Sequence, residues 1–380
     1  MTLLESSSSS SDSDDETLMR LFVRGARVPR LRIHDYIGSV LDQCTDLEFK
    51  AHFRMGRAAV QFILGEIKDL LEAPEPGKGR PRITFLSLDS SLEKASGTVG
   101  NIESIMIYMY HVISYRSVCE KFDIGRATAI RAVRRVTNVL CSTAQNYIHW
   151  PVRPEEVCAE FERKYGFPRV VGAIDGTHIT ITAPSVDAEA YVNRKGRFSI
   201  QLQVICDNSL KFTHCYAGQP GSLHDQRVFR LSEVEGICNN NDNFPNDSHI
   251  IGDAAYAIQR RVLVPYKDNG HLSARQRNCN FRLSSCRMVI ERAIGLLKGR
   301  FRSLLDRLAM TRVDLISNYI IACCVLHNIC LLQNDELNIP LMMDVNPIIK
   351  ANNGPVAATR AEGVEKRRVI TNTLEMNNVR

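Results

Sequence analysis

Four acidic residues lie in segments whose composition could bring them around one reaction centre. Asp175 lies inside a run rich in β-branched residues (170–182), Asp253 ends a short apolar segment, Asp225 follows a Gly/Pro-rich turn, and Glu291 lies in a basic helical segment. A carboxylate among Val, Ala and Ile is costly to bury unless a positive group meets it. Asp175 taken alone is equally compatible with a strand-end carboxylate that accepts hydrogen bonds from a turn at Gly176.

Considered together, the four acids indicate metal chemistry on phosphate esters. Mg²⁺ and Mn²⁺ prefer oxygen ligands, and carboxylates at neighbouring strand ends with one more from a packed helix can supply them. Two such ions about 4 Å apart can activate an attacking water or 3′-hydroxyl and stabilise the leaving oxygen. We therefore predict a site for two divalent cations with the metal ligands Asp175, Asp225, Asp253 and Glu291.

Periodicity predicts the elements that must position these acids. β-Strands are expected over 170–182, over a hairpin formed by 198–206 and 211–217, and over short segments at 249–256 and 262–265. Residues 284–302 form a predicted helix that carries Glu291, and an apolar helix is predicted over 320–332, with His327 and Asn328 as a satisfied core pair. Residues 152–165 are expected to connect into the first strand. His178 and His224, beside two of the acids, are expected to form structural hydrogen bonds.

Positive charge is concentrated around the Glu291 helix. The chain carries a net charge of +6, and residues 273–312 hold ten Lys or Arg against two acids. This block favours a polyanionic partner, most simply nucleic acid, over an ordinary solvated helix face of mixed sign. Arg287 and Lys298 share a helix face with Glu291 and are predicted to hold a phosphate backbone.

The N-terminal region is predicted to be helical. Residues 46–72 show apolar residues at helical spacing and are expected to form two helices broken near Met55-Gly56. Residues 101–140 read as a helix-turn-helix whose last helix, 126–136, exposes Arg126, Arg131 and Arg135 to DNA. A plain helical hairpin is the alternative for this segment.

Composition indicates which segments lie outside the folded core and in which kind of compartment the protein is expected. Residues 5–16 (ESSSSSSDSDDE) are an acidic low-complexity stretch that cannot bury a core, and the segment from residue 333 onward is a polar tail. We expect an intracellular protein without a membrane segment, because neither a signal peptide nor an apolar run of spanning length is evident. The 12 Cys are scattered without a CxxC pair, which favours reduced thiols over a zinc site.

Four ordered motifs resemble those of the PIF/Harbinger transposases and of the nucleases derived from them. They are Gly172-Ala-Ile-Asp-Gly-Thr-His178, Pro220-Gly-Ser-Leu-His-Asp225, Ile251-Gly-Asp-Ala-Ala-Tyr256 and Val289-Ile-Glu-Arg-Ala-Ile-Gly-Leu-Leu-Lys298. The likeness covers nearly the whole chain. Segment 89–100 and the serine-rich leader depart from the family pattern.

The resemblance implies an α/β fold, an RNase H-like DDE nuclease core with a mixed sheet flanked by helices, preceded by a helical, helix-turn-helix-like domain. In it, Asp175, Asp253 and Glu291 match the catalytic triad and Asp225 matches a fourth metal-binding acid. It further implies a nuclear location, with shuttling to the cytoplasm left open, a Myb/SANT-like protein partner and a homodimer that processes two DNA ends.

These observations predict four regions and one main function. The regions are a disordered leader (1–17), a helical N-terminal domain (18–150), the nuclease domain (151–332) and a polar tail (333–380). The predicted function is a Mg²⁺- or Mn²⁺-dependent DNA endonuclease or transposase. The alternative is a domesticated DNA- or chromatin-binding protein that no longer cuts, and a ribonuclease is a more distant possibility because such a core does not by itself select DNA.

Overall fold

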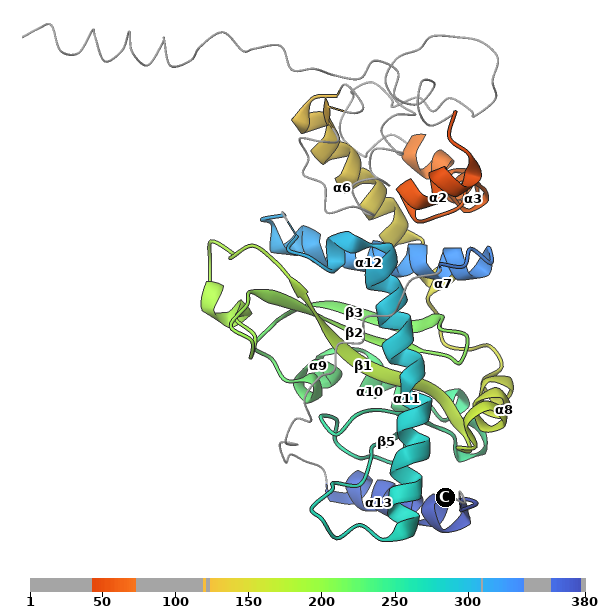
Figure 1. Ribbon diagram of the computed structural model, residues 1–380. Coiled ribbons are helices and arrows are strands. Elements are labelled where there is room, and N and C mark those ends of the chain that lie inside the picture. Colours follow the sequence, from red (N-terminus) through yellow and green to blue (C-terminus); the bar gives the residue numbers. More distant parts are fainter. Residues whose placement is uncertain (1–42, 73–118, 121–123, 309, 338–356, 377–380) are drawn as a thin grey trace, which may run out of the picture.

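A five-stranded mixed sheet forms the centre of the molecule. The computed structural model describes residues 43–72, 119–120, 124–308, 310–337 and 357–376 (Figure 1). The strands are β1 (Val170–Thr180), β2 (Ser199–Cys206), β3 (Phe212–Pro220), β4 (His249–Ile251) and β5 (Val262–Leu263), in the spatial order β3-β2-β1-β4-β5. β2 is antiparallel to both of its neighbours, whereas β4 and β5 continue parallel to β1. The predicted strands are confirmed, and β1 is the central strand.

The predicted hairpin between β2 and β3 is also confirmed, and its turn explains why the chain reverses there. The Asp207 carboxylate accepts hydrogen bonds from the backbone N–H groups of Ser209 and Lys211, at 2.8 and 3.1 Å. Leu210 adopts a positive φ of 68°. An Asp that bonds the backbone two residues ahead is a common way to close a short turn.

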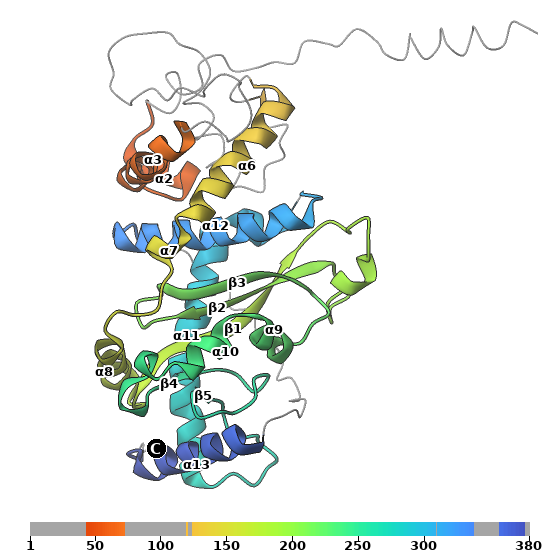
Figure 2. The same cartoon turned by 180° about the vertical axis from the view of Figure 1, so that it is seen from behind.

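Helices cover both faces of the sheet. α11 (Ala274–Arg300) packs on one face, whereas α9 (Asp225–Leu231) and α10 (Val234–Asn239) lie on the other, as the two opposite views show (Figures 1 and 2). α11 begins at Ala274, earlier than the predicted residue 284, because Ser273 and Gln276 form a reciprocal capping box. Four short 3₁₀ segments join these elements: η2 (Ala188–Tyr191), η3 (Asn241–Asn243), η4 (Pro245–Asp247) and η5 (Arg302–Leu304).

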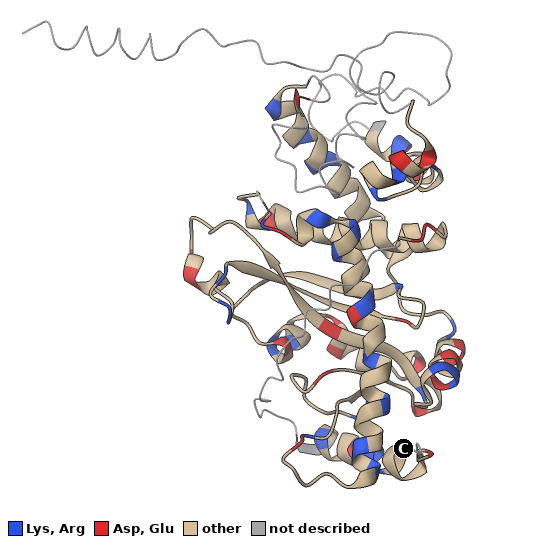
Figure 3. Cartoon of the chain, in the orientation of Figure 1, with Lys and Arg blue, Asp and Glu red and all other residues tan. Residues whose placement is uncertain are grey.

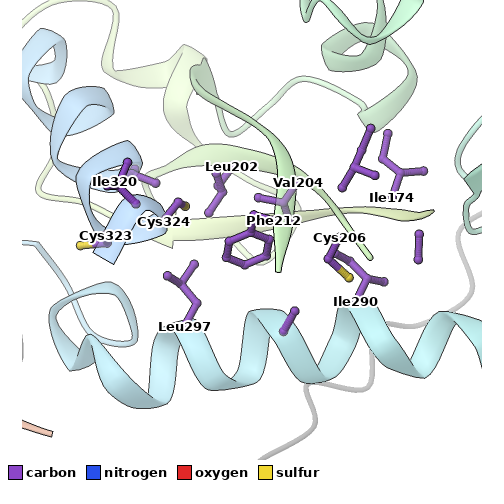
Figure 4. Close-up of a cluster of buried hydrophobic side chains, with 14 of the residues drawn as sticks. Ile174, Leu202, Val204, Cys206, Phe212, Ile290, Leu297, Ile320, Cys323 and Cys324 are labelled. Atoms are coloured by element: carbon purple, nitrogen blue, oxygen red, sulfur yellow. The ribbon is translucent and has the colours of Figure 1, made fainter. Parts of the chain in front are cut away.

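The core lies between the sheet, α11 and α12 (Val313–Leu332). Leu202, Val204 and Phe212 extend from the sheet toward Ile290 and Leu297 of α11, and all five are completely buried (Figure 4). Cys323 and Cys324 of α12 close the same cluster as buried free thiols. Burial of such side chains contributes roughly 1.5–3 kcal/mol each, so this layer fixes α11 against β1.

α12 is the one described helix that is long and apolar enough to cross a membrane. The expectation that the chain lacks such a run is therefore wrong by length and composition. Most of α12 is nevertheless buried inside the fold, where it packs against α6 (Arg126–Ser142), α7 (Ala144–Tyr147) and β3. Asn328 donates to the carbonyls of Tyr147 and Phe212 and accepts from the Phe212 N–H, which confirms it as a satisfied core residue.

The N-terminal helices agree with the predicted break. α2 (Asp46–Phe53) and α3 (Arg57–Glu72) are separated at Arg54–Gly56, and α3 packs against α6. α6 begins at Arg126 as predicted, with Arg126 and Arg131 exposed. Arg135 instead donates to the Leu71 carbonyl at the end of α3, so it serves as an internal helix cap. Most of the two helices predicted before α6 lies outside the described residues, and the helix-turn-helix stays a prediction.

Two segments differ from expectation in being regular helices. The predicted connector contains α8 (Pro154–Tyr165), with Pro154 in the first turn and Gly166 at φ 63° ending it. The predicted polar tail contains α13 (Ala357–Thr373), which packs on α11 and β5. Lys366 of α13 is buried and donates to the carbonyls of Asp247, Ser248 and Arg260. The charged composition of α13 hid this packing, because its basic side chains bond to carbonyl groups.

Asp335 is the centre of a buried ionic cluster at the other end of α11. Its carboxylate lies 2.9 Å from the Arg300 guanidinium and 2.6 Å from the Lys50 ammonium, and it accepts from the Gly56 N–H. Arg300 also donates to the carbonyl of Arg54. The cluster therefore ties α2 and the α2–α3 break to the ends of α11 and α12.

Replacing Asp335 with Ala is expected to lower the free energy of unfolding by about 3–5 kcal/mol, because Arg300 would remain buried without its counter-ion. Urea denaturation measures this loss. The matched control is Asp314→Ala, since Asp314 pairs with Arg312 at the surface, and a change of roughly 0–1 kcal/mol is expected there. Equal losses in the two variants would contradict the structural role of the cluster.

Acidic pH is expected to destabilise the fold through His327. Burial lowers the pKa of His327 to about 4, whereas an unfolded histidine has a pKa of about 6.5. The unfolded state therefore takes up this proton first, and stability is lost as the pH falls from about 6.5 to about 4. His327→Gln should reduce the pH dependence of urea unfolding over this range, while replacement of the exposed His271 should leave it unchanged. Identical pH profiles for wild type and His327→Gln would refute this account.

Candidate functional site

Strand register brings Asp175 and Asp253 together. β1 and β4 are parallel, and Ala173 pairs with Ile251 across them. Asp175, within β1, and Asp253, just past the end of β4, each follow that pair by two residues, so they lie at the same level on neighbouring strands. The Asp175 carboxylate accepts from the Gly176 N–H at 2.8 Å, and the Asp253 carboxylate accepts from the Ala255 N–H at 2.9 Å.

Asp225 reaches the same place from α9. It is the first residue of that helix, after the Gly/Pro turn that the sequence predicted. A Cβ atom at position 176 would lie only 2.6 Å from the Asp225 Oδ1 atom. Glycine at 176 therefore permits the Asp225 carboxylate to lie directly against β1, next to Asp175.

Electrostatics confirm that these three acids act on one another. Burial, together with the charges of Asp253 and Asp225, raises the pKa of Asp175 to about 7, although Arg287 acts to lower it. Burial and the Asp253 charge raise the pKa of Asp225 to about 6, against a lowering effect of Arg194. Mutual repulsion among buried carboxylates is relieved when a cation lies between them.

Glu291 joins the site through an arginine. The Arg287 guanidinium lies 3.3 Å from an Asp175 carboxylate oxygen and 3.4 Å from a Glu291 oxygen. Because Arg287 and Glu291 are four residues apart on α11, they share a helix face. The structure therefore gives Arg287 an internal role, as a cation that links β1 to α11, and its predicted hold on a phosphate backbone stays a prediction.

Lys298 likewise bonds inside the protein. Its ammonium donates to the Thr177 hydroxyl at 2.7 Å and to the His178 carbonyl at 3.2 Å. These bonds anchor α11 to the strand just after Asp175. With Arg135, three of the five cations predicted to contact DNA have internal partners, whereas Arg126 and Arg131 of α6 are exposed.

Tyr256 is a site residue whose orientation the sequence left open. Its side chain is 3% exposed, and its hydroxyl has no hydrogen-bond partner among the described residues. Burial together with the charges of Asp225, Asp175 and Asp253 raises the pKa of Tyr256 well above its usual value. The hydroxyl thus faces the three acids. Spacing along the sequence gives no direction for a side chain, so the motif alone does not place Tyr256 in the site.

The donor chemistry fits a hard divalent cation. Three carboxylates with mutual repulsion and an unsatisfied buried hydroxyl are groups that a bound ion and its water would satisfy. Among the residues that the structure describes, no three Asp, Glu, His or Cys side chains form a ready set of ligands for one ion. Arg287 and backbone N–H groups engage the oxygens instead.

The segment that carries this site is similar to the DDE superfamily endonucleases. The family model of that description matches residues 174–328, which include all four acids. The resemblance to Harbinger-derived nucleases is thereby confirmed.

Individual relatives extend over more of the chain. An Arabidopsis thaliana protein named "Antagonist of like heterochromatin protein 1" is 27% identical over 315 residues, which cover 78% of this chain and 76% of the relative. The mouse protein named "Putative nuclease HARBI1" is 33% identical over 217 residues, 56% of this chain and 61% of the relative. The Xenopus laevis protein of the same name is 27% identical over 303 residues, 76% of this chain and 86% of the relative. No solved structure matches the chain.

In the variant Arg287→Ala, a bound Mg²⁺ ion is expected to take over the role of the lost guanidinium as counter-ion of Asp175 and Glu291. Removal of the guanidinium leaves Asp175 and Glu291 without their shared counter-ion, so the metal-free protein should melt at a lower temperature. Added MgCl₂ should then raise the melting temperature more in the variant than in wild type, by several degrees if the difference is about 1–2 kcal/mol. Thermal unfolding at about pH 8.5, above the pKa of about 7 of wild-type Asp175, measures this.

The matched control is Arg292→Ala, which removes a half-buried cation from the same helix. Its Mg²⁺-dependent shift should equal that of wild type. If Arg287→Ala gains no more from Mg²⁺ than wild type does, the guanidinium does not occupy the place of a metal ion.

Proposed function

We propose that this chain is a metal-dependent DNA endonuclease that cleaves phosphodiester bonds. The observation that carries the proposal is the convergence of Asp175 in β1, Asp253 just past the end of β4 and Asp225 at the start of α9, where the Asp253 charge raises the pKa values of Asp175 and Asp225. The strand order β3-β2-β1-β4-β5, with β2 antiparallel to β1, supports an RNase H-like core. The family match over residues 174–328 supports nuclease chemistry.

Each acid has a proposed role. Asp175, Asp253 and Glu291 are the catalytic carboxylates, and Asp225 is a fourth ligand for Mg²⁺ or Mn²⁺, of which the site takes two. The ions, when bound, would activate the attacking oxygen and stabilise the leaving one. Carboxylates would have to be deprotonated to serve as ligands, and the raised pKa values of Asp175 and Asp225 therefore disfavour binding in acid.

Other residues hold this arrangement. Arg287 neutralises Asp175 and Glu291 while no metal is bound, which lowers the cost of keeping acids together. Lys298 fixes α11 against Thr177 and His178 and so sets the distance from Glu291 to β1. The Tyr256 hydroxyl can donate a hydrogen bond to a carboxylate or to a water within the acid cluster.

The wider biological setting is proposed with it. The substrate is DNA, held in part by the exposed Arg126 and Arg131 of α6. By resemblance to its family the protein acts in the nucleus, as a homodimer and with a Myb/SANT-like partner. The chromatin-related name of one relative keeps a non-cutting DNA- or chromatin-binding protein as the alternative.

Asp253→Asn is expected to abolish cleavage while leaving the fold intact. The substitution keeps the shape of the side chain and its hydrogen bond to Ala255, but it removes the charge that a cation requires. Nicking of supercoiled plasmid in Mg²⁺ or Mn²⁺ should fall by at least about 100-fold, with an unchanged circular dichroism melt. The control Asp268→Asn alters an exposed acid outside the site and should nick like wild type.

Either of two results would reject the proposal. Full nicking by Asp253→Asn would place the chemistry elsewhere. A folded wild-type protein that binds DNA but neither binds divalent cations nor nicks would favour the non-cutting alternative.

A further inference from the structure

A basic turn borders the acids on the side of α9. Residues 193–197, which join η2 to β2, contain Arg194, Lys195 and Arg197, all exposed to solvent. Within the described part of the chain, none of these three cations forms an ion pair with an acid, whereas the surface arginines Arg153, Arg163 and Arg368 do. Three unneutralised charges in four residues repel one another and therefore attract an anion.

Hydrogen bonds within the turn 193–197 hold its backbone in one defined conformation. The Asn193 side-chain oxygen accepts from the backbone N–H groups of Lys195 and Arg197 at 2.9 and 3.1 Å. The Asn193 backbone N–H donates to the Arg197 carbonyl at 2.9 Å, and Gly196 supplies the positive φ of 71° that closes the turn. Val192 and Phe198 pair at its base. The three cations are thus presented on a preorganised backbone, which lowers the entropic cost of binding.

Hydrogen bonds connect the turn to β1. The buried Asn193 amide donates to the Ser199 hydroxyl at 3.0 Å, and that hydroxyl lies 3.1 Å from the His178 Nδ1 atom. Burial, together with Lys298, Arg194 and Lys195, lowers the pKa of His178 to about 4, so the ring is neutral near pH 7 and can accept from Ser199. The turn is therefore fixed relative to the strand that carries Asp175.

Arg194 brings positive charge to the edge of the acid cluster. Its guanidinium contacts the imidazole of His224, the residue directly before α9. Its charge also lowers the pKa of Asp225. Figure 3 shows Lys and Arg both on this turn and on α9.

We propose that the basic turn is the contact for the phosphate backbone of the DNA strand that lies over the acids. This proposal rests on the proposed function, and it differs from the sequence-based expectation, which gave that role to Arg287 and Lys298. Those two cations are half-buried and bonded to protein groups. Arg194, Lys195 and Arg197 are exposed, and hydrogen bonds fix the position of their turn relative to the site. They contact phosphates and not bases, so they hold the strand irrespective of its sequence.

The test is the salt dependence of DNA binding by the full chain without divalent cations. Fluorescence anisotropy with a labelled duplex of arbitrary sequence gives the slope of log K against log salt concentration. Each phosphate contact contributes about 0.9 to that slope. The variant Arg194→Ala/Lys195→Ala/Arg197→Ala should therefore reduce the slope by roughly 2–3 and weaken binding, with an unchanged melting temperature.

Two further variants separate a local contact from a general effect of charge. Arg153→Ala/Arg163→Ala/Arg368→Ala removes the same number of positive charges, two from α8 and its N-cap and one from α13. This variant should leave the slope near that of wild type. Arg194→Lys/Arg197→Lys keeps the charges and should also retain the slope. If both alanine variants lower the slope equally, or if neither does, the basic turn is not a DNA contact.

The binding readout is independent of cleavage. A reduced slope in the turn variant together with a wild-type protein that does not nick would reject the endonuclease and retain the contact. An unchanged slope together with metal-dependent nicking would reject the contact and retain the endonuclease.

Discussion

Repulsion among buried carboxylates is the constraint on which the rest of the site depends. Asp175, Asp225 and Asp253 meet beside the central strand β1 because the parallel register of β1 and β4 and the start of α9 place them there. Such a cluster opposes folding unless positive charge is supplied, because removal of charged groups from water is costly. In the metal-free chain Arg287 supplies part of that charge and also ties Glu291 to the cluster. Under the proposed function, divalent cations would meet the same electrostatic demand.

Two groups of arginines and lysines can therefore be distinguished, those bonded within the protein and those that face solvent. Many of those around α11 donate to backbone carbonyls: Arg275 to Asn372, Arg282 to Gly166, and Lys366 of α13 to Asp247, Ser248 and Arg260. They act as internal cross-links whose charge is satisfied within the protein. The cations of the turn 193–197 have no acidic counterpart among the described residues. Net charge alone does not distinguish these groups, although exposed cations without an internal counter-ion are better suited to bind a polyanion.

The sequence alone could not show which cations bond within the protein and which face solvent, although it could predict other features. The β1 strand, the β2–β3 hairpin and the α2–α3 break could be predicted because apolar periodicity and turn residues depend on short-range physics. The convergence of the acids could be predicted in kind, since the motifs lie at strand ends. The direction of each cation could not be predicted, because it depends on which carbonyl or carboxylate the tertiary fold brings near. Arg135 and Lys298 were thus assigned to DNA although they bond to Leu71 and Thr177. Similarly, the polar composition of 357–373 gave no sign that this segment forms the packed helix α13. The spacing of residues in the sequence does not show in which direction the Tyr256 side chain points.

α11 explains how a site made from distant segments can keep its geometry. Its first half is held by α13, where Asn278 and Arg282 both donate to the Glu375 carbonyl. Its last residue, Arg300, is held by the buried Asp335 cluster, which also fixes α2. Arg287, Glu291 and Lys298 lie between these two anchors, and the core beneath them is closely packed (Figure 4). A helix fixed at both ends cannot slide along its axis, so the distance from Glu291 to β1 is set by contacts outside the site. The N-terminal helices and α13 therefore help to position the site, although none of them contributes an acid to it.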